Sequence, residues 1–280
     1  MSALLDDLVT AALAAGAVVM RFYEDGAAVA HKGDGSPVTE ADEAAEALIL
    51  ADLSRLDASI PVVAEEQAAA GLVPASSSRF FLVDPVDGTK EFISRNGEFT
   101  VNIALVENGV PVAGVVYAPA LGRLFAGAGT EAWQAQVQNG ALGPRETMRV
   151  RAAPARLVAV GSKSHGSAET QRYLEPFPVE RFVSRGSSLK FCLLAAGEAD
   201  IYPRLGRTME WDTAAGDAVL RAAGGRVATL DGAPLCYNKR DQAEDCDFAN
   251  PHFVAFGDPA VADLANAADR VEVSAGTFAP

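Results

Sequence analysis

The chain has 280 residues, of which 49% are hydrophobic and 21% are charged, the composition of a globular protein with a full hydrophobic core. Its 37 acidic and 23 basic residues give a net charge of −14, which argues against sequence-independent nucleic-acid binding, because such binding needs a basic face. A bound divalent cation can reverse the local charge of a site, so acidity does not exclude an anionic substrate.

The cysteines and the N-terminus indicate a cellular location. Cys192, Cys236 and Cys246 are scattered and form no C-x-x-C motif, which favours reduced thiols over disulfides or a zinc site. No basic residue precedes Arg21, so the start does not resemble a signal peptide, and the apolar stretch 8–20 is shorter than the ~20 residues of a membrane span. We expect a cytoplasmic protein without an integral membrane segment, with peripheral attachment to the cytoplasmic face of the inner membrane left open.

The first third of the chain predicts two helices and a short strand. Apolar residues recur at spacings of three and four over 2–24, the pattern of an amphipathic helix. Residues 39–42, Thr-Glu-Ala-Asp, have the spacing of a capping box before a second apolar helix. A short β-like segment over 60–64 then ends at Glu65 and Glu66.

An apolar run over 79–83 predicts a buried strand that ends at Asp84. Pro85 has no N–H group, so we expect the strand to stop there. Gly88 permits a tight turn, and Thr89 is placed to cap the helix that follows. The sequence thus predicts a strand, an acidic turn and a helix start in direct succession.

The remaining sequence divides into two patterns. Alternating strands joined by Asn-Gly turns complete the first half as an antiparallel meander, whereas strands alternate with helices from residue 157 onward. This succession predicts an α+β part followed by an α/β part. We expect an N-terminal domain over 1–151 that carries most metal ligands, a C-terminal domain over 152–270 and a tail over 271–280.

Four carboxylates are candidates for a metal site. Asp84 and Asp87 follow the central strand, Glu65 follows an earlier one, and Asp212 precedes an Ala-rich helix. Asp residues also cap turns and helices, and a Glu pair is common at a solvated strand end, so each residue has a purely structural alternative. Together they are typical of an oxygen-ligand site for Mg²⁺ rather than a histidine-containing zinc site.

Two motifs resemble a known family. Residues 84–89, Asp-Pro-Val-Asp-Gly-Thr, together with residues 211–216, Trp-Asp-Thr-Ala-Ala-Gly, resemble the paired signature of the lithium-sensitive inositol monophosphatase superfamily. The stretches 97–105, 186–192 and 202–204 are similar to its bacterial bisphosphate nucleotidase branch, of the CysQ type. The resemblance covers most of the chain. It implies a layered αβαβα sandwich with two sub-domains.

The resemblance also assigns roles in catalysis. It implies a phosphatase that uses two or three Mg²⁺ ions, with Asp42, Thr89 and Glu65 as catalytic residues. Asp42 and Thr89 would activate the attacking water, although the capping box also explains Asp42. The implied metal ligands are Glu65, Asp84, Asp87 and Asp212, with the backbone carbonyl of Val86.

The implied substrate is a nucleoside bisphosphate, held in part by the second domain. Groups at helix starts can bind phosphate, although ordinary helix capping is the alternative. The acidic stretch 240–249 is longer than expected for the branch and either shapes one rim of the site or forms a solvated loop. The expected substrate contacts are Glu65, Val86, Asp87, Gly88, Thr89, Ser164, His165, Ser187, Ser188, Lys190 and Asp212.

The implied reaction is removal of the 3′-phosphate of adenosine 3′,5′-bisphosphate to give AMP, in sulfur assimilation or nucleotide recycling. The same enzyme could convert 3′-phosphoadenylyl sulfate to adenylyl sulfate. Alternatives are an inositol-1-phosphate or sugar bisphosphate phosphatase with the same metal centre, and a non-catalytic binder of metal and phosphate. A monomer and a homodimer both fit the sequence.

Overall fold

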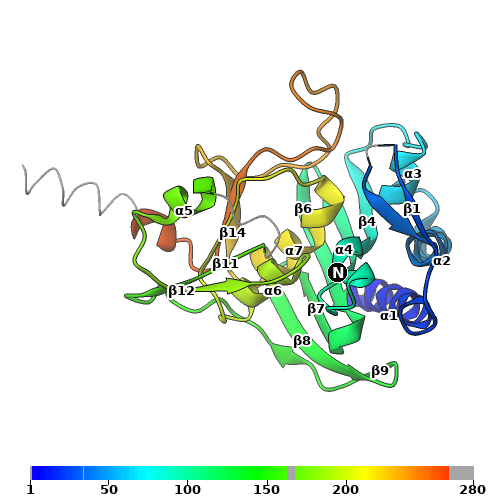
Figure 1. Ribbon diagram of the computed structural model, residues 1–280, viewed down its shortest axis with the longest axis horizontal. Helices are drawn as coiled ribbons and strands as arrows, with labels where there is room; N and C mark the ends of the chain where they lie inside the picture. The colour runs from blue at the N-terminus through cyan, green and yellow to red at the C-terminus, as the bar shows by residue number, and fades with distance from the viewer. Residues whose placement is uncertain (1, 34, 163–167, 265–280) are drawn as a thin grey trace, which may run out of the picture.

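The computed structural model describes residues 2–33, 35–162 and 168–264. Helices and sheets alternate as five layers, so the expected αβαβα sandwich is confirmed (Figure 1). The α-helices are α1 (Ser2–Asp25), α2 (Glu40–Asp57), α3 (Glu65–Ala69), α4 (Thr89–Ile93), α5 (Ala168–Leu174), α6 (Leu189–Ala195) and α7 (Glu210–Ala222), and a 3₁₀ turn spans Pro119–Leu121.

The larger sheet has the order β10-β8-β7-β6-β5-β4-β3, and β9 pairs with β8. Strands β4 to β8 form the predicted antiparallel meander, and only β3 runs parallel to its neighbour β4. A separate two-stranded ribbon joins β1 (Val29–His31) to β2 (Pro37–Thr39). The sheet strands are β3 (Val62–Ala64), β4 (Arg79–Asp87), β5 (Thr100–Glu107), β6 (Val110–Ala118), β7 (Arg123–Ala128), β8 (Glu131–Gln138), β9 (Ala141–Leu142) and β10 (Glu146–Thr147).

The smaller sheet has the order β12-β11-β13-β15-β14. Strands β12, β11 and β13 are parallel, while β15 runs antiparallel to both of its neighbours. Parallel strands need long crossover connections, which α5 and α6 supply here. These strands are β11 (Leu157–Gly161), β12 (Val179–Ser184), β13 (Ile201–Arg204), β14 (Arg226–Thr229) and β15 (Phe253–Phe256).

The layers pack through continuous hydrophobic clusters. Helices α1 and α2 cover one face of the larger sheet, and α6 and α7 fill the space between the two sheets. Helix α7 approaches the larger sheet very closely. A Cβ atom at Gly114 of β6 would lie 2.6 Å from the carbonyl oxygen of Ala215, so only glycine permits this contact. The close approach places the start of α7 beside the end of β4.

Helix α1 confirms the helix predicted over 2–24 and ends one residue later, at Asp25. Its segment Ala3–Asp25 is long and apolar enough to cross a membrane by length and composition, so the expectation that it is too short was wrong. Core helices of soluble proteins pass the same test, however, and this helix packs on the larger sheet, with Leu8, Ala12 and Val19 fully buried.

Strand β4 differs from the prediction at the acidic turn. It does not stop at Pro85 but continues to Asp87, which pairs with Thr100 of β5. The register shifts between Asp84 and Asp87, and a proline is tolerated at such a bulge because no ladder hydrogen bond is required there. The bulge therefore places both aspartates on one continuous strand end.

The helix start after β4 also differs. Gly88 is the residue before α4 and has φ 92°, a left-handed conformation that favours glycine. Thr89 is the first helical residue and makes no capping hydrogen bond, so its predicted capping role was wrong. Its hydroxyl is instead directed to Asp42 and to the Val86 carbonyl.

Other local predictions are confirmed. Residues 39–42 form the capping box of α2, and the Asn108–Gly109 turn joins β5 to β6 with both residues at positive φ. Helix α7 begins at Glu210, three residues earlier than an N-cap at Asp212 would require. The division into domains at residues 151 and 270 stays a prediction.

Candidate active site

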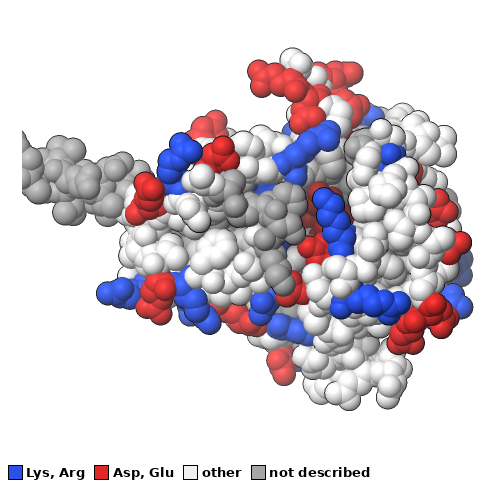
Figure 2. Space-filling model, viewed as in Figure 1, with Lys and Arg blue, Asp and Glu red and all other residues white. Residues whose placement is uncertain are grey.

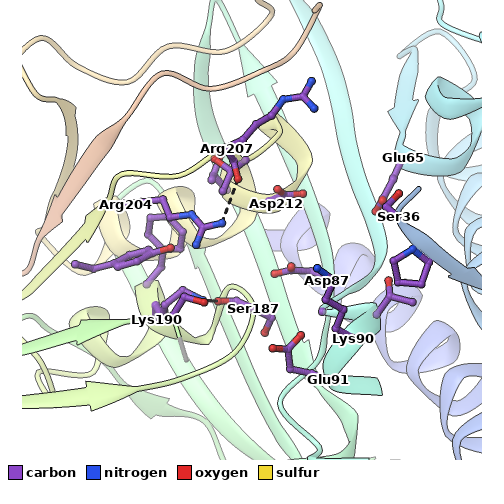
Figure 3. Close-up of a pocket in the computed structure, with 18 residues that line it drawn as sticks. Ser36, Glu65, Asp87, Lys90, Glu91, Ser187, Lys190, Arg204, Arg207 and Asp212 are labelled. Carbon is purple, nitrogen blue, oxygen red and sulfur yellow. Dashed lines mark hydrogen bonds between the residues drawn. The ribbon is translucent and has the colours of Figure 1, made fainter. Parts of the chain in front are cut away.

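A cavity of about 330 Å³ lies between the two halves of the molecule. Figure 2 shows acidic and basic side chains gathered in a hollow on this face. The close-up shows Glu65, Asp87 and Asp212, from α3, β4 and α7, facing the same space (Figure 3). The predicted site residues that line the cavity are Glu65, Asp87, Gly88, Thr89, Ser187, Lys190 and Asp212.

Several predicted residues lie directly behind the cavity wall. Asp42, Asp84, Val86 and Ser188 are each 1% exposed. The Val86 carbonyl accepts a hydrogen bond of 3.3 Å from the Thr89 hydroxyl, and the Val86 N–H donates to Asp84 Oδ1 at 3.0 Å. These contacts hold the bulged end of β4 in one conformation.

The predicted residues Ser164 and His165 lie outside the described residues. Ser188 is described, and its hydroxyl is fully engaged. It donates to the Asp212 carbonyl at 2.6 Å and accepts from Asn102 at 3.0 Å, while Asn102 also reaches Asp87 at 3.4 Å. Ser188 thus connects the strand that carries Asp87 to the helix that carries Asp212. Its predicted contact with substrate stays a prediction.

The buried carboxylates raise one another's pKa. Burial raises the pKa of Asp84 well above its ordinary value, and the charges of Glu65, Asp87 and Asp212 add to this effect. Burial also raises the pKa of Asp212 well above its ordinary value, and the negative charges of Asp87 and Glu65 add smaller contributions. Burial also raises the pKa of Asp87, although the nearby Lys190 ammonium opposes it. Four like charges in one buried region require compensation by a cation.

The donor set fits a hard divalent cation. Carboxylate oxygens and a backbone carbonyl are the ligands that Mg²⁺ prefers. Within the described ranges, no three His, Cys, Asp or Glu side chains are grouped tightly enough to form a metal site as they stand. One side of the cluster is already paired, because Lys32 Nζ lies 2.6 Å from Glu65 Oε1 and 2.7 Å from Glu66 Oε1.

No sequence pattern pointed to Lys32 as part of the site. Lys32 lies just beyond β1, in a polar stretch for which the sequence predicted no role. Burial alone would lower its pKa, but the two carboxylates raise it overall. Burial raises the pKa of Glu66 to about 7. The tertiary structure therefore places the Lys32 ammonium group and the Glu66 carboxyl beside Glu65, at the edge of the site.

The two carboxylate oxygens of Asp42 have different partners. Its Oδ2 atom accepts from the Thr39 hydroxyl at 2.6 Å and from the Thr39 N–H at 2.9 Å. Its Oδ1 atom lies 3.3 Å from the Thr89 hydroxyl. Burial raises its pKa, although the hydrogen bonds from Thr39 oppose this shift. The capping box and the catalytic role are therefore compatible, because each uses a different oxygen.

The opposite wall of the cavity is cationic. Lys190 is 6% exposed, donates to the Ser187 carbonyl, and has its pKa lowered to about 8 by burial. Arg204, at the end of β13, also lines the cavity and is a site residue that the sequence did not predict. Arg204 Nε and Ser187 Oγ are buried atoms without a hydrogen-bond partner among the described residues. A bound anion would satisfy both groups.

The acidic stretch 240–249 contacts one residue of the cavity wall. Arg207 lines the cavity and donates to Asp245 Oδ1 at 3.1 Å and to Cys246 Sγ at 2.9 Å. The loop projects at the top of the molecule in Figures 1 and 2. Arg207 therefore ties the acidic loop to the wall of the cavity.

Comparison with known proteins identifies the class. Residues 1–250 match the model of the inositol monophosphatase family, and the chain belongs to that family.

Particular members are also similar. The chain is 45% identical over 253 residues to the 3′(2′),5′-bisphosphate nucleotidase CysQ of Escherichia coli (strain K12), covering 89% of this chain and 98% of that protein. It is 40% identical over 254 residues to CysQ of Buchnera aphidicola, covering 90% and 93%. Among solved structures, CysQ from Bacteroides thetaiotaomicron matches with a TM-score of 0.74 and 39% identity, covering 91% of this chain and 97% of that one. The expected family and branch are thereby confirmed.

Proposed function

We propose that this protein is a Mg²⁺-dependent 3′(2′),5′-bisphosphate nucleotidase that hydrolyses adenosine 3′,5′-bisphosphate to AMP and phosphate. One observation carries the proposal: a single cavity has half-buried carboxylates on one wall, with the buried Asp84 behind them, and the cationic groups of Lys190 and Arg204 on the other. A nucleoside bisphosphate has two phosphate groups, one for each wall. The similarity to CysQ proteins supports this substrate class.

Glu65, Asp84, Asp87, Asp212 and the Val86 carbonyl would hold Mg²⁺, which supplies positive charge to the transferring phosphate when it is bound. Asp42 and Thr89 then act on the attacking water. The Thr89 hydroxyl accepts a proton from that water and passes its own proton towards Asp42 Oδ1, 3.3 Å away. The raised pKa of Asp42 makes its carboxylate a better proton acceptor.

Other groups orient the substrate. The N–H groups of Gly88 and Thr89 lie at the start of α4 and lack intrahelical partners, so they can hold oxygens of the reacting phosphate. Lys190, Arg204 and Ser187 would bind the second phosphate at the opposite wall. No covalent intermediate is needed, because positioning and charge account for most of the rate in phosphate hydrolysis.

Two finer points belong to the same proposal. The use of 3′-phosphoadenylyl sulfate as a second substrate follows from the same two-walled cavity, because its sulfate-bearing end is also anionic. A cytoplasmic location is supported by three free thiols at Cys192, Cys236 and Cys246. The choice between a monomer and a homodimer stays a prediction.

The test is phosphate release from adenosine 3′,5′-bisphosphate, with inositol-1-phosphate and a sugar bisphosphate in parallel. We expect the nucleotide to be hydrolysed with the highest kcat/KM, only with Mg²⁺, and Asp84→Asn to abolish turnover while the protein remains folded. Preference for inositol-1-phosphate would instead support the alternative phosphatase. Binding of Mg²⁺ and nucleotide without phosphate release would refute an enzymatic function.

A further inference from the structure

Glu210 is a buried carboxylate without a role in the proposed mechanism. It is 0% exposed and stands two positions before Asp212 in the first turn of α7, where residues two apart do not share a helix face. Its carboxylate accepts three hydrogen bonds, from the Asn238 N–H at 2.7 Å and from the N–H and the ammonium group of Lys239 at 2.8 and 2.7 Å. The first turn of α7 is therefore attached to the segment after β14.

The backbone of this turn is attached to the same segment. The Glu210 N–H donates to the Phe248 carbonyl at 2.8 Å, and Met209 forms an isolated β-bridge with Ala249. The Asn250 side-chain amide donates to the Met209 carbonyl at 2.7 Å and to the Thr213 hydroxyl at 3.1 Å. Contacts thus surround Asp212 on both sides in sequence, from residue 209 to residue 213.

The network continues into the other half of the molecule. The side-chain amide of Asn238 donates to Ser76 Oγ and to the Ser77 carbonyl, both at 3.2 Å. Asn238 has φ 73°, a left-handed conformation that asparagine tolerates better than most residues. The Ser77 hydroxyl in turn bonds to the backbone of Arg79, the first residue of β4. A continuous path therefore runs from Glu210 to the strand that carries Asp84 and Asp87.

We propose that Glu210 is a positioning residue, which with Asn238 holds Asp212 in register with the aspartates of β4. Asp212 would then complete the metal site only while this attachment is intact. The proposal deepens the proposed function and rests on it in one respect, the assignment of Asp212 as a ligand. A purely stabilising role for Glu210 is the competing explanation.

Asp217 provides a matched control on the same helix. It is also 0% exposed, pairs with Arg221 at 2.7 Å, and accepts from the Tyr237 hydroxyl at 3.0 Å. Like Glu210 it bonds to the segment after β14, but it lies more than one helical turn from Asp212. Loss of either carboxylate should lower stability, whereas only loss of Glu210 should disturb Asp212.

The experiment measures Mn²⁺ binding to the full-length protein by electron paramagnetic resonance, with Mn²⁺ alone as the probe and the melting temperature as a second readout. The Glu210→Gln side chain has the same size, but one carboxylate oxygen is replaced by an NH₂ group. It therefore cannot accept hydrogen bonds from both Asn238 and Lys239, which bond to different oxygens of Glu210. We expect Glu210→Gln to weaken Mn²⁺ binding about tenfold or more, while Asp217→Asn lowers the melting temperature and changes binding less than about twofold.

Asn238→Gly keeps the Glu210–Lys239 ion pair, removes the side-chain link to Ser76 and Ser77, and accepts the left-handed backbone of this position. It decides the question if Glu210→Gln does not fold, and we expect weaker Mn²⁺ binding with a nearly unchanged melting temperature. Folded variants at 210 or 238 that bind Mn²⁺ as the wild type does would overturn the proposal, as would undiminished binding by Asp212→Asn. A wild-type protein that releases no phosphate from the nucleotide would refute the proposed function separately, because the Mn²⁺ series needs no turnover.

Discussion

The Thr89 hydroxyl lies 3.3 Å from Oδ1 of Asp42, a residue 47 positions earlier in the chain. The other oxygen of the same carboxylate receives the two hydrogen bonds that start helix α2. One side chain therefore links a helix start to the catalytic cavity. Its two functions can be separated experimentally by changing the partner of each oxygen.

Thr89→Val removes the hydroxyl and leaves the capping box intact. We expect kcat to fall by about 10² to 10⁴, the usual contribution of a proton-transfer group, with little change in melting temperature. Thr39→Ala should do the reverse, costing about 1 kcal/mol of stability through the lost cap with kcat within a few-fold of the wild type. Steady-state kinetics and thermal unfolding of both variants check the prediction. An equal loss of kcat in both would show that the two oxygens do not act separately.

The carboxylate cluster predicts an unusual dependence of stability on pH. The pKa values of Asp84 and Asp212 are raised in the folded protein, so the folded state binds more protons than the unfolded state above the ordinary value of 3.8. Their contribution to stability must therefore fall as pH rises. With a chelator present, we expect the melting temperature to decrease as the pH rises above about 4, where these carboxyls ionise in the unfolded chain but stay protonated in the folded one, and Mg²⁺ to raise it more at the higher pH.

Asp84→Asn should raise the melting temperature of the metal-free protein by several degrees, because it removes one of the mutually repelling charges. It should also reduce the response to Mg²⁺. The exposed Asp6→Asn is the control and should change neither quantity. A metal-free Asp84→Asn protein that is clearly less stable than the wild type would contradict the electrostatic explanation.

The lowered pKa of Lys190 leads us to expect a KM that depends on pH. Burial lowers its pKa to about 8, so the ammonium group loses its charge at a pH at which most lysines keep theirs. We expect the KM for adenosine 3′,5′-bisphosphate to rise above about pH 8 and the KM for inositol-1-phosphate to rise much less. Lys190→Met should raise the nucleotide KM about tenfold and remove this pH dependence.

Lys90→Met is the matched control, since Lys90 also lines the cavity but is exposed. It should leave the pH at which KM rises unchanged. An unaltered pH profile in Lys190→Met would assign the titration to another group, such as the substrate phosphate itself.

The close contact between Gly114 and α7 leads us to expect that core packing at this point affects metal binding by Asp212. A Cβ atom there would lie 2.6 Å from the Ala215 carbonyl and 2.8 Å from the Ala218 side chain, so Gly114→Ala must push α7 away from the sheet. We expect a loss of about 1 to 3 kcal/mol in stability, together with weaker Mg²⁺ binding because α7 carries Asp212. Thermal unfolding and metal titration test this. Gly33→Ala, which places its Cβ in open space, should affect neither, and normal metal binding in Gly114→Ala would show that Asp212 tolerates the shift.

The sequence by itself determined much of this protein. Capping boxes, Asn-Gly turns and periodic apolar runs depend on neighbouring residues, so α2, the β5–β6 hairpin and α7 were predictable. The acidic motif at 84–89 was also visible, because a strand end and two carboxylates lie within a few residues. Its continuation through Pro85 was not, since the bulge depends on pairing with β5.

Only the tertiary structure decided how the pieces of the site meet. Lys32 pairs with Glu65 and Glu66, which lie more than 30 positions later in the chain. Lys190 is buried by the packing of the fold around it. No local sequence pattern encodes either of these features. The same holds for Glu210, whose position suggested no function until Asn238 linked it to the segment before β4. Burial and long-range charge pairing set the pKa values of the site, and both arise only when the two halves of the chain pack together.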